Sequence, residues 1–153
     1  MGRLKRGAAI TGVAIALIGG FEGLRLNAYK DVIGIATACY GETLNIRMGM
    51  KFTKAQCDEM FIKRLAQFET GMRKCLKSPD SIPNKPYVAF LSLSYNIGTG
   101  GFCKSSVARL ANAGNLRGAC DALLKFNRAG GVVWNGLTKR RQTERKLCLE
   151  GLS

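Results

Sequence analysis

Six cysteines, spread along a chain of 153 residues, are the feature that most limits how this sequence can fold. Successive cysteines are 18, 18, 28, 17 and 28 residues apart, so none forms the short C-x2-C pairs of a zinc ribbon. An even number of well-separated cysteines in a small chain favours disulfides made in an oxidising compartment. Six cysteines allow fifteen sets of three bonds, and spacing alone does not choose among them. The six are Cys39, Cys57, Cys75, Cys103, Cys120 and Cys148.

The charge balance points to a negatively charged partner. Twenty-four Lys and Arg against ten Asp and Glu leave a net charge of +14, which draws a protein toward polyanions. Nucleic acid, anionic lipid and a bacterial envelope with acidic polymers are the candidates. The chain has no histidine, which excludes Ser-His-Asp and Cys-His catalytic units and histidine-containing zinc sites. We expect neither a cofactor nor a metal.

An uncharged stretch rich in small residues, residues 7–21, follows the basic residues Arg3, Lys5 and Arg6. A stable membrane span needs about 20 strongly apolar residues, so this stretch is marginal as an anchor. The basic flank and short apolar body are typical of a secretion signal, but no A-x-A cleavage site is evident. A first helix packed into the core is the third interpretation. Short apolar runs are ambiguous, and the sequence leaves all three open.

Helical periodicity begins at Thr53. Thr53 and Gln56 have the spacing of a capping box, and apolar residues then recur at three- and four-residue steps. This pattern predicts one long helix over 53–76. Prolines break the chain after it. The further elements that we predict are a helix over 84–97, a flexible loop over 98–101, helices over 105–114 and 115–126, a loop over 127–136 and a last helix capped by Thr138.

Two features near the C-terminal end concern packing. Trp134, the only tryptophan, lies in the predicted loop over 127–136, and we interpret it as a core side chain rather than a platform for sugar rings. Arg140 and Arg141 precede Glu144 by four and three residues, so either can pair with it on one helix face. Such exposed pairs contribute only about 0.3–0.5 kcal/mol. Alternatively, Arg141 points toward an active-site carboxylate and orients it.

The segment from Glu22 to Gly41 carries the candidate chemistry. Glu22 and Asp31 are two carboxylates nine residues apart, and Thr37 adds a hydroxyl six residues later. Two carboxylates facing each other are the minimal equipment for breaking a glycosidic bond. Glu22 ends an apolar run, where we expect partial desolvation to favour the protonated acid. Asp31 and Thr37 lie on two predicted short strands joined by a turn.

A resemblance to a known family rests on these residues. The run E-G-L-R-L-N-A-Y-K-D, followed by the glycine and threonine before C-Y-G, resembles the phage T4-type lysozymes and endolysins, whose signature is E, eight residues, D or C, five residues, T. The similarity continues through S-Y-N-I-G-T-G-G-F at 94–102, Ser106, Arg109, and G-L-T-K-R-R at 136–141 with Glu144. It spans nearly the whole chain. Many relatives have histidine where Glu42 stands, so contacts just after Gly41 are expected to differ.

The resemblance implies an α+β, mainly helical fold of the lysozyme type, forming a single domain over 1–153. A long helix joins a small N-terminal lobe, which contains a β-hairpin, to a larger helical C-terminal lobe. On this fold the cysteines pair as Cys39–Cys57, Cys75–Cys103 and Cys120–Cys148. The implied segments are an N-terminal helix or signal-anchor at 1–21, the catalytic lobe at 22–52, the linking helix at 53–76 and the helical lobe at 77–153.

The resemblance also implies a function: an endolysin that hydrolyses the β-1,4 bond between N-acetylmuramic acid and N-acetylglucosamine in bacterial peptidoglycan, with inversion, and so lyses the host cell. Glu22 is the expected general acid, and Asp31 and Thr37 are expected to position and activate water. The protein is expected to be a monomer that acts in the host periplasm after export or holin-mediated release. The expected substrate contacts are Gly41, Glu42, Asn96, Gly98, Phe102 and Arg141.

Two questions stay open at this point. Some endolysins of this type carry a weak, Gly/Ala-rich signal-anchor that leaves the membrane and joins the soluble fold, which would give residues 8–21 a transient association with the inner membrane. The rival function is a cationic protein that binds the envelope or disrupts membranes without hydrolysis. We do not expect a nucleic-acid partner, because the basic residues are dispersed and no helix-turn-helix or RNA-binding motif stands out.

Overall fold

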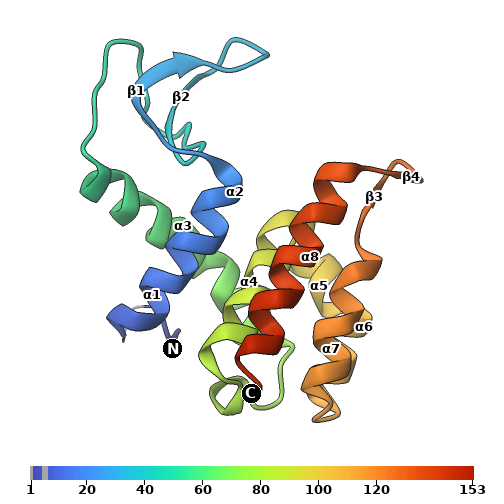
Figure 1. Ribbon diagram of the computed structural model, residues 1–153. Helices are drawn as coiled ribbons and strands as arrows, with labels where there is room; N and C mark the ends of the chain where they lie inside the picture. The colour runs from blue at the N-terminus through green and yellow to red at the C-terminus, as the bar shows by residue number, and fades with distance from the viewer. Residues whose placement is uncertain (1, 5–6) are drawn as a thin grey trace.

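An apolar helical segment starts the fold. The computed structural model describes residues 2–4 and 7–153, so Lys5 and Arg6 of the basic flank lie outside the described residues. Helix α1 (Ala8–Ala14) continues into a π-helical turn, η1 (Ile15–Gly19), and then into α2 (Gly20–Glu22). These elements follow one another as one rod that leads up to the β-hairpin (Figure 1).

Three apolar residues of this rod pack into the core. Ile10, Ala14 and Ile18 are buried, and their four-residue spacing places them on one face. The rod ends at Glu22 because Gly23 has φ of 79°, a conformation that glycine adopts without strain. In this structure the segment is a packed first helix, an interpretation compatible with the other two. Within residues 2–4 and 7–153, no helix has both the length and the apolar character that crossing a bilayer requires.

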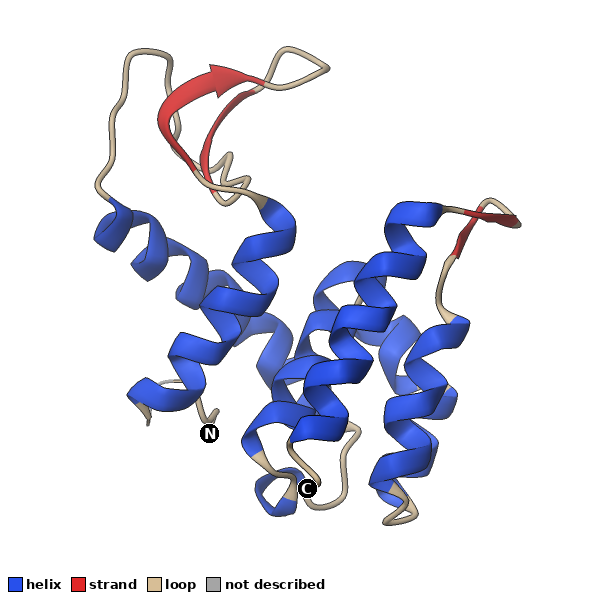
Figure 2. Ribbon diagram, in the orientation of Figure 1, coloured by secondary structure: helices blue, strands red, loops and turns tan. Residues whose placement is uncertain are grey.

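A two-stranded antiparallel hairpin follows, as predicted. Strands β1 (Arg25–Lys30) and β2 (Ala36–Cys39) lie at the end of the molecule away from both chain termini (Figures 1 and 2). Tyr29 pairs with Thr37, and the register is irregular between Arg25 and Tyr29. The hairpin therefore holds residues 31–35 in a turn that projects from the small lobe.

Helix α3 (Lys54–Lys74) links the two lobes and begins where the sequence predicts. The Thr53 hydroxyl accepts a hydrogen bond from the Gln56 amide at 3.1 Å, and the Gln56 side chain accepts one from the Thr53 amide at 2.8 Å. Both halves of the capping box are thus present. The helix buries one stripe of side chains, which consists of Cys57, Phe61, Leu65, Glu69 and Met72.

The larger lobe is built around α4 (Asn84–Ile97). Nine consecutive residues of this helix, 86–94, are buried, so neighbouring elements cover it on all sides. The last helix, α8 (Asn135–Glu150), packs along it. The other elements of the lobe are η2 (Pro79–Ser81), α5 (Thr99–Cys103), α6 (Ser106–Asn112), α7 (Leu116–Ala122), η3 (Leu123–Lys125), β3 (Arg128–Ala129) and β4 (Val132–Val133).

Four predictions for this lobe are wrong. The loop expected over 98–101 is mostly helical, because α5 starts directly after Gly98. The loop expected over 127–136 contains an antiparallel hairpin, β3 with β4. Trp134, the residue directly after β4, is exposed rather than packed in the core. Helix α8 begins at Asn135 rather than after a Thr138 cap, and the side chain of the preceding residue, Trp134, makes no capping hydrogen bond among the described residues.

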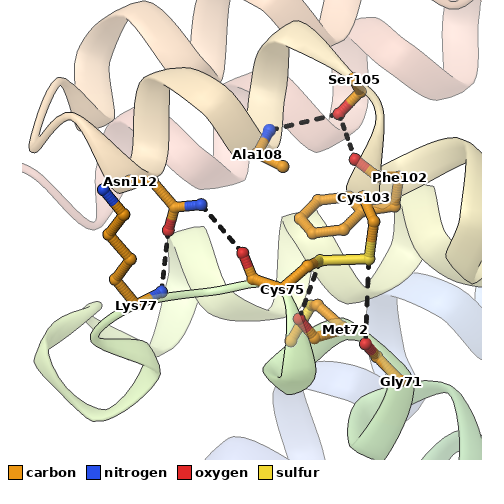
Figure 3. Close-up of a disulfide and its surroundings, with 9 residues drawn as sticks. All are labelled: Gly71, Met72, Cys75, Lys77, Phe102, Cys103, Ser105, Ala108 and Asn112. Atoms are coloured by element: carbon orange, nitrogen blue, oxygen red, sulfur yellow. Dashed lines mark hydrogen bonds between the residues drawn. A yellow bond between two sulfur atoms is a disulfide. The ribbon is translucent and has the colours of Figure 1, made fainter.

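All three disulfides implied by the resemblance are present: Cys39–Cys57, Cys75–Cys103 and Cys120–Cys148. The first ties β2 to α3, and the third ties α7 to α8. The second joins the end of α3 to α5 (Figure 3). Beside it, the Asn112 side chain donates to the Cys75 carbonyl and accepts from the Lys77 amide, both at 2.8 Å. Each bond therefore crosses between elements that the chain alone does not hold together.

The start of the chain is clamped onto α3 by a buried carboxylate. Glu69 accepts hydrogen bonds from the backbone amides of Arg3 at 2.7 Å and Leu4 at 3.2 Å, and from the Tyr87 hydroxyl. The Arg3 guanidinium lies over the Tyr87 ring, 4.2 Å from its centroid, and donates to the Pro79 and Ile82 carbonyls. This polar cluster fixes residues 2–4 against the linking helix.

Replacing Glu69 with methionine should release this segment. We expect the free energy of unfolding to fall by about 2–3 kcal/mol, because buried donors lose their acceptor. Urea unfolding measures the loss, and limited proteolysis should show new cleavage near residues 2–7. Glu59→Met on the same helix is the control, since among the residues that the structure describes Glu59 forms only an exposed pair with Lys63 at 3.8 Å. Equal stability of the two variants would contradict the clamp.

Candidate active site

Glu22 stands at the junction of the two lobes. It is the last residue of α2, and its Oε2 lies 3.1 Å from Nη1 of Arg140 on α8. The same guanidinium covers the ring of Phe21, 4.5 Å from its centroid. The Glu22 side chain keeps 26% of its surface exposed, so it is partly removed from water. A charged contact from the opposite lobe also holds its carboxylate.

A buried ionic cluster stands behind Arg140. Glu144, one turn further along α8, is fully buried. Its Oε2 lies 3.4 Å from Nε of Arg140 and accepts from Nη2 of Arg141 at 2.8 Å. The Ser92 hydroxyl of α4 also donates to Glu144. Burial raises the pKa of Glu144, and the two guanidinium groups and the Ser92 hydroxyl oppose that rise.

Arg141 faces inward rather than toward Glu22. It is fully buried, its Nε lies 2.7 Å from Oε1 of Glu144, and Nη1 donates to the Phe126 carbonyl at 3.3 Å. The prediction that Arg141 could orient an active-site carboxylate is therefore wrong, and its neighbour Arg140 makes that contact. Both arginines also belong to buried pairs, so the exposed pairing with Glu144 that we expected does not occur.

Asp31 and Thr37 lie on the β-hairpin of the small lobe. One carboxylate oxygen of Asp31, Oδ1, accepts from the backbone amides of Ile33 at 3.0 Å and Ile35 at 2.8 Å. These bonds shape the turn and leave Oδ2 without a hydrogen bond from any described residue. Thr37 is buried, with 4% of its surface exposed, and its hydroxyl donates to the Ile35 carbonyl at 2.9 Å. The hydroxyl oxygen keeps its capacity to accept a hydrogen bond.

Glu42 shapes the loop after β2. Its Oε1 accepts from the amides of Thr43 and Leu44, both at 3.0 Å, and from Nη2 of Arg64 at 2.9 Å. Burial alone would raise the pKa of Glu42, but these hydrogen bonds, above all that from Arg64, lower it below the usual value. Glu42 is thus a charged brace between this loop and α3. Gly41, just before it, is exposed with φ of 87°.

Tyr95 of α4 is a neighbour of the site that sequence reasoning did not single out. Its ring packs edge-on against Phe61 and Phe68, with centroids 5.9 and 4.9 Å away. Burial raises its pKa, and the negative charges of Glu22 and Glu42 add to that rise. Its hydroxyl therefore lies within electrostatic reach of both carboxylates.

The sequence model for the family described as phage lysozyme matches residues 19–144. The chain belongs to the phage lysozyme family. It is 39% identical to a protein named SAR-endolysin from Enterobacteria phage P21, over 94% of this chain and 93% of that one.

Two solved structures share the fold of this phage lysozyme. A mutant of the P22 lysozyme has a TM-score of 0.79 at 32% identity, covering 90% of this chain and 95% of that one. The active form of the phage P1 endolysin also has a TM-score of 0.79, at 26% identity, covering 95% and 92%. The mainly helical lysozyme fold expected from the sequence is therefore confirmed.

The remaining expected substrate contacts divide into two groups. In this phage lysozyme, Asn96 is exposed in the last turn of α4, and Gly98 follows with φ of 90°. Phe102, by contrast, is fully buried and packs near Phe90 at a centroid distance of 6.3 Å. Phe102 cannot touch a ligand without unfolding of the lobe, so its assignment as a contact is wrong.

Proposed function

We propose that this phage lysozyme is a muramidase that hydrolyses the β-1,4 bond between N-acetylmuramic acid and N-acetylglucosamine in peptidoglycan. The single observation that supports this most is the anchoring of Glu22. Its carboxylate ends a helix of one lobe and contacts Arg140 of the other lobe at 3.1 Å, and the buried Glu144 in turn braces Arg140. A catalytic acid needs such a fixed position relative to the scissile bond.

In the proposed reaction, Glu22 gives its proton to the glycosidic oxygen as the bond from that oxygen to the anomeric carbon breaks. Water held by the free oxygen of Asp31 and by Thr37 attacks the opposite face of the anomeric carbon. Asp31 accepts a proton from that water, and the product has the inverted configuration. Asn96 and Gly98 are the proposed sugar contacts from the helical lobe.

The place where the enzyme acts is part of the same proposal. We infer that the enzyme works as a monomer in the host periplasm, an oxidising compartment that suits its three disulfides. We further infer that residues 8–21 associate with the inner membrane before they pack as α1, η1 and α2. The name SAR-endolysin of the relative from phage P21 supports this stage, as does the mostly small and apolar composition of the segment.

Product analysis tests the proposed reaction. We expect digestion of purified peptidoglycan to release fragments with N-acetylmuramic acid at the reducing end, identified by mass spectrometry. Proton NMR during the first minutes should show the α-anomer of the new reducing end ahead of the β-anomer. Anhydromuramic ends would refute attack by water, and early β-anomer would refute inversion. Release of peptides alone would refute glycosidase activity.

A further inference from the structure

Two hairpin tips expose apolar side chains at the end of the molecule away from both termini. The first tip is the β1–β2 turn, with Val32, Ile33 and Ile35, and the second is β4 with the next residue, namely Val132, Val133 and Trp134. In Figure 1 the hairpins project from different lobes on that side. Val32 and Ile33 are 104% and 75% exposed. Soluble proteins seldom leave such side chains together in water without a partner.

The chain around both tips is basic. Arg25 and Lys30 belong to the strand that enters the first tip, and Lys125 and Arg128 precede the second. Between Ala122 and Thr143 the sequence has no acidic residue. The first tip has one, Asp31, whose Oδ1 already accepts two backbone hydrogen bonds. The tips are therefore apolar at their ends and cationic at their bases.

The indole ring of Trp134 is suited to an apolar environment. It is 56% exposed, but its ring N–H already donates to the Ala129 carbonyl at 3.2 Å. Its backbone amide donates to the Asn127 carbonyl at 3.0 Å. Moving an indole out of water is costly when its N–H loses a partner, and here the partner comes from the same hairpin. The ring can thus leave water without breaking a hydrogen bond.

We propose that the two hairpin tips form a docking surface for an anionic lipid bilayer. The bilayer interface suits both parts of each tip, since aliphatic and tryptophan side chains enter the acyl boundary while Lys and Arg remain among the phosphates. Convex tips on separate lobes do not form the single groove that a protein segment would fill. This surface does not include Arg140 or Glu144, but its first tip contains Asp31, the carboxylate proposed to hold the attacking water. Vesicle binding is therefore measured apart from hydrolysis.

Trp134 offers a direct test, because it is the only tryptophan of the chain. We expect its fluorescence to shift to shorter wavelength when the protein meets vesicles of phosphatidylglycerol and phosphatidylethanolamine, and not with vesicles of phosphatidylcholine. Lipids brominated in their acyl chains should quench it. Unchanged emission with anionic vesicles would overturn the proposal. A shift with soluble peptidoglycan fragments and none with vesicles would also overturn it, because the tip would then contact glycan.

A matched pair of variants distinguishes vesicle binding through the tips from non-specific binding through any exposed apolar side chain. Ile33→Ser and Leu44→Ser remove side chains of similar exposure, 75% and 70%, but only Ile33 belongs to a tip. We expect Ile33→Ser to weaken vesicle binding about tenfold, and Leu44→Ser to leave it within about twofold of the wild type. Val132→Ser should act like Ile33→Ser. Equal effects of Ile33→Ser and Leu44→Ser would refute a docking surface confined to the tips.

Discussion

Glu22→Gln is expected to remove most of the hydrolytic activity and leave the fold unchanged. The amide keeps the size of the side chain but cannot donate a proton to the leaving oxygen, and general acid catalysis contributes about 10²–10⁴-fold in rate. Arg140 loses one anionic partner but keeps Glu144, 3.4 Å from its Nε. The free energy of unfolding should therefore change by less than about 1 kcal/mol, as for a partly exposed pair.

Reducing-end release from purified peptidoglycan measures the rate, and thermal unfolding measures the stability. Glu59→Gln is the matched control, because it makes the same chemical change on an exposed residue of α3, 73% exposed at its side chain. It should have the activity of the wild type. If Glu22→Gln cleaves as fast as this control, Glu22 is not the acid. If it is inactive but also melts far below the control, the loss reflects folding rather than chemistry.

The predictable parts of the fold are those that depend on interactions between residues close together in the sequence. Thr53 and Gln56 predict the start of α3 because a capping box involves two residues three positions apart in the sequence. Gly98 ends α4 as expected, since its φ of 90° favours glycine. The helix directly after Gly98 was not predicted. The two later glycines suggested a flexible loop, yet the chain turns at once into α5, and Phe102 near its end fills the core.

The contact between Arg140 and Glu22 could not be predicted from local pattern. Neighbouring residues on a helix point about 100° apart, so either Arg140 or Arg141 could have faced the site. Which one does so depends on how α8 packs against α4, a long-range property. Whether Glu144 is buried likewise depends on how α8 packs against α4. Periodicity showed that Glu144 could pair with either arginine, but not that the pair would lie inside the lobe.

Trp134 was misassigned although a local signal was present. Gly130 and Gly131 have φ of 60° and 77°, the two positive values of a type I′ turn, and two such glycines between short runs are a strong hairpin signal. Val132 and Val133 provide the second strand. Aromatic character alone does not place a side chain in the core. A hairpin at this position puts the side chains at its end into solvent.

Glu144→Leu is expected to have the largest effect on stability. It leaves Arg141, which is fully buried, without its counterion, and removing one partner of a buried ion pair costs about 3–5 kcal/mol. The Ser92 hydroxyl loses its acceptor as well. Denaturant unfolding of the oxidised protein should show this loss. Activity at low temperature should also fall, because Arg140 loses the carboxylate that braces it toward Glu22.

Two further variants distinguish a lost charge pair from a badly fitting leucine. Glu150→Leu changes a residue of the same helix whose exposed pair with Lys85 spans 3.5 Å, and it should cost less than about 1 kcal/mol. In the double variant Glu144→Leu, Arg141→Met, no uncompensated charge remains at position 141, and apolar replacement of a whole buried pair is often neutral. We expect the double variant to regain most of the stability that Glu144→Leu loses. A double variant less stable than Glu144→Leu alone would show that shape rather than charge governs this part of the core.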